Sequence, residues 1–277
     1  MSRADGLATP ARRATAPADG ASERRSSVIG VSLKMYFDPE RTVSWCRQVA
    51  DLARDHEATR NGRVTLFVLP SFPALQRAIH AVAGSPVSVG AQDLFWEDRG
   101  PYTGGVSGSD LRQIGCTLVE VGHVERRVVF GEDQPTVRRK LAAALRNGLQ
   151  PVLCVGEREA GAPGPAAQTA LDQLASAVDG LGRPSPQTPL VVAYEPEWAI
   201  GADRSATPDH VISVMSSLRD WLDARPNLAG YSLIYGGSAG PGVLASLDGT
   251  ADGLFLGRFA HDPLALLPVL DEALAIA

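Results

Sequence analysis

Short apolar runs alternate with longer amphipathic segments along nearly the whole chain of 277 residues. The short runs are rich in β-branched residues and have the length of buried strands. They predict strands at 28–32, 64–69, 87–91, 117–121, 151–155, 190–194, 231–235 and 252–256. The segments between them place apolar residues at helical spacing. They predict helices at 39–57, 73–83, 107–114, 134–147, 166–180, 207–224, 239–247 and 263–275.

This alternation is typical of an α/β protein with a parallel sheet, because parallel strands need helical crossovers and are buried on both faces. Eight strand–helix units in about 250 residues are what a closed parallel (β/α)₈ TIM barrel requires. We therefore expect one barrel domain over residues 28–277. An open doubly wound sheet is the alternative, but no G-x-G-x-x-G follows the first strand to favour it.

The first 27 residues differ from the rest of the chain. Residues 1–27 are rich in Ala, Arg, Ser and Gly and show no apolar periodicity, so we expect a disordered tail. Their arginines and scarce acidic residues also resemble an organelle transit peptide, although no amphipathic face accompanies them.

Composition and charge exclude several classes of protein. A formal net charge of −5 and a pI near 5.6 argue against a nucleic-acid binder. No apolar run approaches the roughly 20 residues that span a bilayer, so we expect no membrane segment. The three cysteines show neither a pairing pattern nor metal-ligand spacing. We expect reduced thiols in a cytoplasmic protein that needs no metal or other cofactor. The cysteines are Cys46, Cys116 and Cys154.

The segment Tyr194–Gly201 carries the most specific candidate chemistry. It places the carboxylate of Glu195 directly after a predicted strand and continues as Pro-Glu-Trp-Ala-Ile-Gly. Catalytic residues of such barrels lie at the C-terminal ends of the strands. In the residues that follow, Pro196 is stiff, residues 198–200 are apolar and Gly201 is flexible, and this combination suits a lid over Glu195. If a lid removes water from this carboxylate, its pKa rises and it can act as a general base. A surface ion pair is the alternative role.

Two further residues end strands at the same rim. Lys34 follows the first strand, in a chain whose only other lysine is Lys140, and His123 follows the fourth. A lysine there can neutralise a phosphate or a developing enolate oxygen, and a histidine can polarise a carbonyl. Each has a plain alternative, a solvated charge for Lys34 and a packed structural histidine for His123. Their shared location with Glu195 favours a catalytic site.

The loops after the seventh and eighth strands predict a phosphate site. Gly236, Gly237 and Ser238 end one strand and Gly257 the next, so backbone N–H groups can approach an anion closely. A glycine pair alone is a weak signal, but its place in the barrel strengthens it. The whole rim therefore predicts an aldose–ketose isomerase that binds a small phosphorylated sugar and moves a proton through an enediolate.

At residues 28–276 the chain resembles the triosephosphate isomerase family. Three motifs carry most of the resemblance: Gly122-His123 followed by Glu125-Arg126-Arg127, the segment 194–201, and Tyr235-Gly236-Gly237-Ser238. The remaining matching segments are 90–93, 102–104, 130–132 and 151–157.

The resemblance implies roles for individual residues. It implies Glu195 as base, His123 as electrophile, Lys34 as electrostatic partner and Glu125 as a supporting carboxylate, under a loop that closes over the substrate. It further implies phosphate contacts from three residues, Gly201, Ser238 and Gly257, and a homodimer in which the loop 93–106 inserts into the neighbouring subunit.

Four positions depart from the family's usual residues. Ser32 stands where asparagine is usual, Val124 replaces a serine, Arg258 replaces the second glycine of a pair, and Gly105 replaces a glutamate. Ser32 leaves extra room near the reacting carbons. Arg258 adds a five-donor guanidinium near the phosphate or the far end of the sugar. Without a hydroxyl at residue 124, we expect Glu195 to have another partner or to move before the lid closes.

The changes at Ser32 and Arg258 resemble the branch of the family that acts on four-carbon keto-phosphates. We therefore expect interconversion of L-erythrulose 1-phosphate and D-erythrulose 4-phosphate. The triose phosphate reaction, between dihydroxyacetone phosphate and glyceraldehyde 3-phosphate, is the first alternative. A non-catalytic barrel that binds a sugar phosphate is the second, although binding alone would not require a base under a lid.

Overall fold

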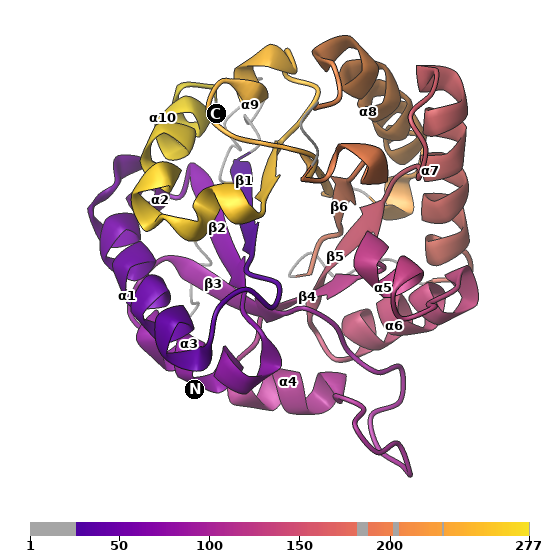
Figure 1. Cartoon of the computed structure of the whole chain (residues 1–277). Coiled ribbons are helices and arrows are strands. Elements are labelled where there is room, and N and C mark those ends of the chain that lie inside the picture. Colours follow the sequence, from indigo (N-terminus) through magenta and orange to yellow (C-terminus); the bar gives the residue numbers. More distant parts are fainter. Residues whose placement is uncertain (1–25, 182–187, 202–204, 229, 277) are drawn as a thin grey trace, which may run out of the picture.

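The computed structural model describes residues 26–181, 188–201, 205–228 and 230–276. Most of the predicted tail, residues 1–25, lies outside these ranges, and Ser27 already belongs to the first strand. The strands form one closed barrel in sequence order, and every neighbouring pair is parallel (Figure 1). The predicted single (β/α)₈ barrel is confirmed, and the open doubly wound sheet is excluded.

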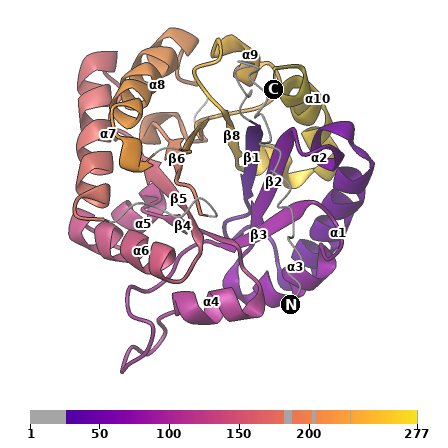
Figure 2. The ribbon, with the colours of Figure 1, turned by 180° about the vertical axis from the view of Figure 1, so that it is seen from behind.

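The predicted strands match the observed ones within about one residue. They are β1 (Ser27–Ser32), β2 (Val64–Leu69), β3 (Val87–Ala91), β4 (Leu118–Val121), β5 (Gln150–Val155), β6 (Val191–Tyr194), β7 (Ser232–Tyr235) and β8 (Gly253–Leu256). The helices form a ring outside the barrel, as both ribbon views show (Figures 1 and 2). They are α1 (Pro39–Asp55), α2 (Glu57–Arg60), α3 (Leu75–Ala81), α4 (Gly108–Ile114), α5 (Val124–Val128), α6 (Gln134–Arg146), α7 (Pro163–Val178), α8 (Pro208–Asp223), α9 (Val243–Ser246) and α10 (Leu266–Ile276).

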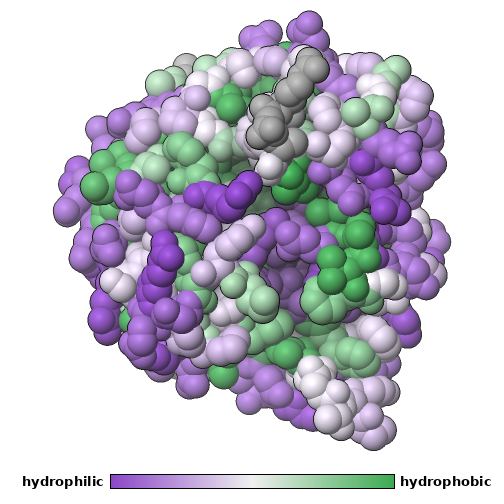
Figure 3. Space-filling view, in the orientation of Figure 1, coloured by the Kyte–Doolittle hydropathy of each residue, from purple (hydrophilic) through white to green (hydrophobic). Residues whose placement is uncertain are grey.

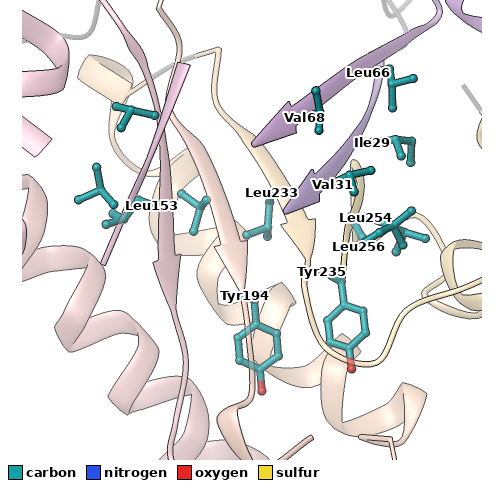
Figure 4. Packing of buried hydrophobic residues seen from close by; sticks show 14 of the residues in the cluster. Ile29, Val31, Leu66, Val68, Leu153, Tyr194, Leu233, Tyr235, Leu254 and Leu256 are labelled. Carbon is teal, nitrogen blue, oxygen red and sulfur yellow. The ribbon is translucent and has the colours of Figure 1, made fainter. Parts of the chain in front are cut away.

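Strand side chains alternate between two apolar clusters, because successive residues of a strand point to opposite faces. One cluster packs the barrel against its helices, and Figure 4 shows part of it, with Ile29 and Val31 of β1 near Leu254 and Leu256 of β8. The second, smaller cluster fills the barrel interior. Its members are Val28, Phe67, Leu69, Leu118, Val152, Cys154, Val191, Ala193, Ile234 and Phe255.

The helical predictions needed correction in two ways. The predicted helix at 239–247 is wrong over most of its length, since only Val243–Ser246 are helical. Gly242 precedes them with φ 83°, a left-handed conformation that does not continue a helix. Conversely, two short helices were not predicted: α2, which follows α1, and the five-residue helix α5. Helix α5 begins directly after β4, with His123 as its N-cap residue.

The loop between β3 and α4 projects away from the barrel in both ribbon views (Figures 1 and 2). The backbone N–H of Phe95 donates to the carbonyl of Val106 at 2.7 Å, which closes the base of this loop. Within this loop, the exposed side chain of Tyr102 packs on Phe95, with ring centroids 4.6 Å apart. Among the helices of the described ranges, none combines the length and the apolar character needed to cross a membrane.

Candidate active site

The C-terminal ends of the strands surround a cavity of about 700 Å³. Figure 3 shows a hollow near the middle of the face seen in Figure 1, with hydrophilic residues in its depth. Every residue that the sequence predicted for the site lines this cavity. They are Ser32, Lys34, His123, Glu125, Glu195, Gly201, Gly236, Gly237, Ser238, Gly257 and Arg258.

Lys34 is held in an unusual conformation just beyond β1. Its φ of 47° is left-handed, which is uncommon for a residue with a side chain. The amide of Gln92 stabilises this turn by donating to the carbonyls of Lys34 and Leu69, each at 2.9 Å. The ammonium group donates to Glu125 Oε1 at 2.7 Å. Burial acts to lower the pKa of Lys34, but the hydrogen bond and charge of Glu125, with the charge of Glu195, outweigh it and raise the pKa. Lys34 therefore stays charged.

His123 is oriented by the start of α5. Its side chain is buried, and Nδ1 accepts a hydrogen bond from the backbone N–H of Glu125 at 3.1 Å. A ring nitrogen that accepts cannot also carry the proton, so the neutral ring has its hydrogen on Nε2. That nitrogen lies 3.7 Å from Glu195 Oε2. The imidazole thus presents an N–H donor to the space beside the carboxylate.

Glu195 follows β6 directly, and its side chain is only 6% exposed. Its Oε2 is buried and has no hydrogen-bond partner within the described ranges. Gly236 leaves room for it, because a side-chain carbon there would lie 2.6 Å from Cγ of Glu195. A buried carboxylate oxygen without a partner is available to accept a proton. Val124 contributes no hydroxyl to it, as expected from the sequence.

The other side of the cavity combines glycines with two polar side chains. Ser238 Oγ donates to the carbonyl of Ala199 at 2.8 Å, which links the loop after β7 to the loop after β6. Arg258 Nη2 lies 3.5 Å from the carbonyl of Gly201, so this side chain reaches across the cavity mouth to the same loop. Gly201 has φ 66°, and Gly257 has open space where a side chain would stand. Backbone and guanidinium donors therefore surround this end of the cavity.

Sequence comparison places this geometry in a known family. The sequence model of the family described as triosephosphate isomerase matches residues 27–273. The chain belongs to the triosephosphate isomerase family. It is accordingly an isomerase, and the relatives that it matches over most of their length carry isomerase names.

The named relatives fall in two groups. The chain is 46% identical to L-erythrulose-1-phosphate isomerase of Pectobacterium atrosepticum, over 91% of this chain and 98% of that protein. It is 38% identical to triosephosphate isomerase of Moorella thermoacetica, over 89% of this chain and 98% of that protein. It is also 37% identical to L-erythrulose-1-phosphate isomerase of Rhizobium etli, over 87% of this chain and 90% of that protein.

The loss of the family's glutamate at Gly105 does not leave Arg126 alone. Its guanidinium pairs within the same chain, with Asp93 Oδ2 at 2.9 Å and Glu132 Oε1 at 2.6 Å. Lys140 Nζ contacts the same two carboxylates, at 2.6 Å and 2.5 Å. These four side chains form a charged cluster at the base of the projecting loop.

Sequence reasoning missed a buried polar cluster behind the lid segment. Glu157 accepts from Trp198 Nε1 at 2.8 Å and from the hydroxyl of Tyr194 at 3.0 Å, and His210 Nε2 lies 3.2 Å from the same carboxylate. The signal in the sequence was Glu157, an acidic residue that closely follows an apolar strand.

Glu120 was missed as well. It is a single acidic residue inside the apolar strand β4, and its side chain is only 3% exposed. Over the described part of the chain, no group of histidine, cysteine and acidic residues has the arrangement of a metal site.

Proposed function

We propose that this isomerase moves a carbonyl group between neighbouring carbons of a short sugar phosphate through an enediolate. The observation that carries the proposal is the meeting of Lys34, His123 and Glu195 in one cavity. Glu195 has the free buried oxygen of a base, His123 has an N–H donor beside it, and Lys34 supplies a fixed positive charge.

Each group then has a defined step. The carboxylate of Glu195 removes a proton from the carbon next to the carbonyl, and the electron pair moves onto the carbonyl oxygen. The Nε2–H of His123 and the ammonium of Lys34 stabilise the negative charge that develops there. The protonated Glu195 returns the proton to the former carbonyl carbon. The imidazole of His123 passes the hydroxyl proton of the first carbon to the neighbouring oxygen, so that the carbonyl forms at the first carbon. Glu125 supports the site by holding Lys34 and His123.

The four-carbon pair is the substrate we favour. In L-erythrulose 1-phosphate the carbon that loses its proton carries a hydroxymethyl group, whereas in dihydroxyacetone phosphate it carries only a second hydrogen. Ser32 lines the cavity with a side chain shorter than the asparagine usual in the family, which leaves space for that group. Arg258 adds donors at the mouth. The names of two relatives favour the same substrate.

A substrate panel tests the proposal. Purified protein is assayed with three- and four-carbon aldose and ketose phosphates, beside a Glu195→Gln variant. We expect kcat/KM for L-erythrulose 1-phosphate to exceed that for dihydroxyacetone phosphate by at least about tenfold, and the variant to lose nearly all activity. A preference for dihydroxyacetone phosphate would instead favour triosephosphate isomerisation and a place in glycolysis rather than in erythritol catabolism.

A barrel that only binds sugar phosphates is the competing function. In deuterated water an isomerase incorporates deuterium at the reacting carbons, because Glu195 exchanges the abstracted proton with solvent. A binding protein incorporates none. Binding without incorporation for every substrate in the panel would therefore support this alternative.

We also propose that the protein works as a homodimer in the cytoplasm. The projecting loop 93–106 and the exposed apolar side chains of Met35, Tyr102 and Phe130 support a contact between subunits. The three cysteines are free thiols, all buried, which suits a reducing compartment.

A further inference from the structure

Glu120 points into the barrel, directly beneath the cavity. Residues two apart on a strand share a face, and Leu118, two positions earlier on β4, belongs to the interior cluster. Glu120 is therefore a carboxyl group among apolar interior side chains such as Leu118 and Val152. The reaction described above does not use it.

Within the described part of the chain, no cation forms an ion pair with this buried carboxyl. Over the described residues, no lysine, arginine or histidine lies within ion-pair distance of Glu120, whereas Lys34 pairs with Glu125. The nearest polar partner is the thiol of Cys154, whose Sγ lies 3.8 Å from Glu120 Oε1. Burying an ionised carboxylate without a pair is costly, so such a group favours its neutral form.

Cys154 also connects Glu120 with Glu195. Burial raises the pKa of the Cys154 thiol well above its usual value, and the charges of Glu195 and Glu120 both raise it further. The thiol therefore keeps its single hydrogen. The negative charge of Glu195 likewise raises the pKa of Glu120 and so favours a proton on Glu120.

The environment of Glu120 suits it to keep a proton. Burial raises the pKa of Glu120 to about 7. The negative charge of Glu195 raises the pKa further, the positive charge of Lys34 lowers it and the negative charge of Glu125 raises it, so these charges oppose one another; a protonated His123 would lower it as well. Glu195 follows β6, Lys34 lies in the turn after β1, Glu125 lies on α5 and His123 lies just before it.

We propose that Glu120 carries a proton in the working enzyme and acts as a positioning residue beneath the proposed base, Glu195. When Glu120 loses its proton, a further negative charge appears beneath the site. That charge opposes the negative enediolate, because charges interact strongly in a water-poor cavity.

The protonation itself is measurable without substrate. Infrared titration of the protein, with a Glu120→Gln spectrum subtracted, is expected to show a carboxylic-acid C=O band that disappears as the pH rises through about 7. In Glu195→Gln the neighbouring charge is absent, so the band should disappear at lower pH. Absence of such a band between about pH 5 and pH 6, or a midpoint unmoved by Glu195→Gln, overturns the proposal. The comparison of wild type with Glu195→Gln needs no change at residue 120, so it remains decisive if Glu120→Gln does not fold.

The effect on the reaction rests on the proposed function and has its own readout. With the preferred substrate, wild-type kcat/KM is expected to fall about tenfold between about pH 6.5 and pH 8.5, and the Glu120→Gln profile less than about threefold. Two profiles of identical shape, differing only in height, would mean that Glu120 has only a packing role. If no substrate of the panel reacts, the proposed function fails while the infrared titration still tests the proton on Glu120.

Discussion

Gly236 leaves the space in which the carboxylate of Glu195 stands. A side-chain carbon on Gly236 would lie 2.6 Å from Cγ of Glu195 and 2.8 Å from its Oε1. The two residues cannot move apart easily, because the backbone N–H of Gly236 donates to the carbonyl of Tyr194 at 2.8 Å. The glycine after β7 is therefore a steric requirement of the proposed base.

Replacing Gly236 with alanine should displace Glu195 while the barrel still folds. Gly236 does not have a positive φ, so the added carbon strains the contact with Glu195 rather than its own backbone. A shift of about 1 Å in a catalytic group costs about a hundredfold in rate, and we expect kcat to fall by that order. Gly240→Ala is the matched control, since its added carbon meets Phe259 at an ordinary 3.6 Å. Equal kcat values for the two variants would contradict the steric role.

Arg258 is expected to contribute to the choice between three- and four-carbon substrates. Its guanidinium reaches the carbonyl of Gly201 at the cavity mouth. The family usually has a glycine, not an arginine, at position 258. In Arg258→Gly, kcat/KM for L-erythrulose 1-phosphate should fall by about tenfold or more relative to that for dihydroxyacetone phosphate. Arg258→Lys keeps the charge but loses the planar donor fork, so it separates the two contributions. If both substrates lose activity equally in both variants, Arg258 binds only the phosphate that they share.

The sequence predicted the fold and the rim of the cavity because both depend on local patterns. Apolar runs mark the strands, and the C-terminal ends of parallel strands meet at one rim, so Lys34, His123 and Glu195 could be brought together without coordinates. The prediction of a helix at 239–247 was wrong for a local reason too. Gly240 and Gly242 flank a proline there, and these three residues disfavour a helix, but the prediction gave more weight to the helical spacing of the apolar residues.

Other features depend on which face of a strand a residue occupies and on distant partners. Glu120 lies inside the barrel only because β4 is paired with its particular register, and a one-residue shift would turn it outward. In the sequence, Arg126 lacks its usual partner, because Gly105 replaces the family's glutamate. Its carboxylate partners are Asp93, at a separate strand end, and Glu132, which also contacts Lys140 on α6.

Lys140 should be a major contributor to stability. It is 3% exposed and lies 2.6 Å from Asp93 and 2.5 Å from Glu132. Removing one partner from a buried ionic cluster costs about 3–5 kcal/mol, so Lys140→Met should lower the free energy of unfolding by that amount in urea titrations. Arg77→Met breaks an exposed pair with Glu40 and should cost far less. Similar losses in the two variants would mean that the buried cluster adds little.

The homodimer proposal is tested by sedimentation. We expect the wild-type protein to sediment as a dimer and Tyr102→Asp to sediment as a monomer, because the charge would be buried in the contact of the projecting loop. Leu264→Asp is the control: this residue is also an exposed apolar side chain, 65% exposed, but lies after β8, away from the loop. A wild-type monomer, or a dimer that survives Tyr102→Asp, contradicts a contact through this loop.

Glu120 should also make the folded protein less stable as the pH rises. Its pKa is about 7 in the folded state against 4.5 for an ordinary glutamate, so between these pH values the folded chain binds more protons than the unfolded chain. Stability then falls as the pH rises through this window, by on the order of 3 kcal/mol over its whole width. Glu120→Gln has no such proton to lose. Its free energy of unfolding, relative to wild type, should therefore increase between about pH 5 and pH 8 in urea titrations. A difference that stays constant over this range would show that Glu120 ionises at an ordinary pKa, and the proton proposed on Glu120 would have no physical basis.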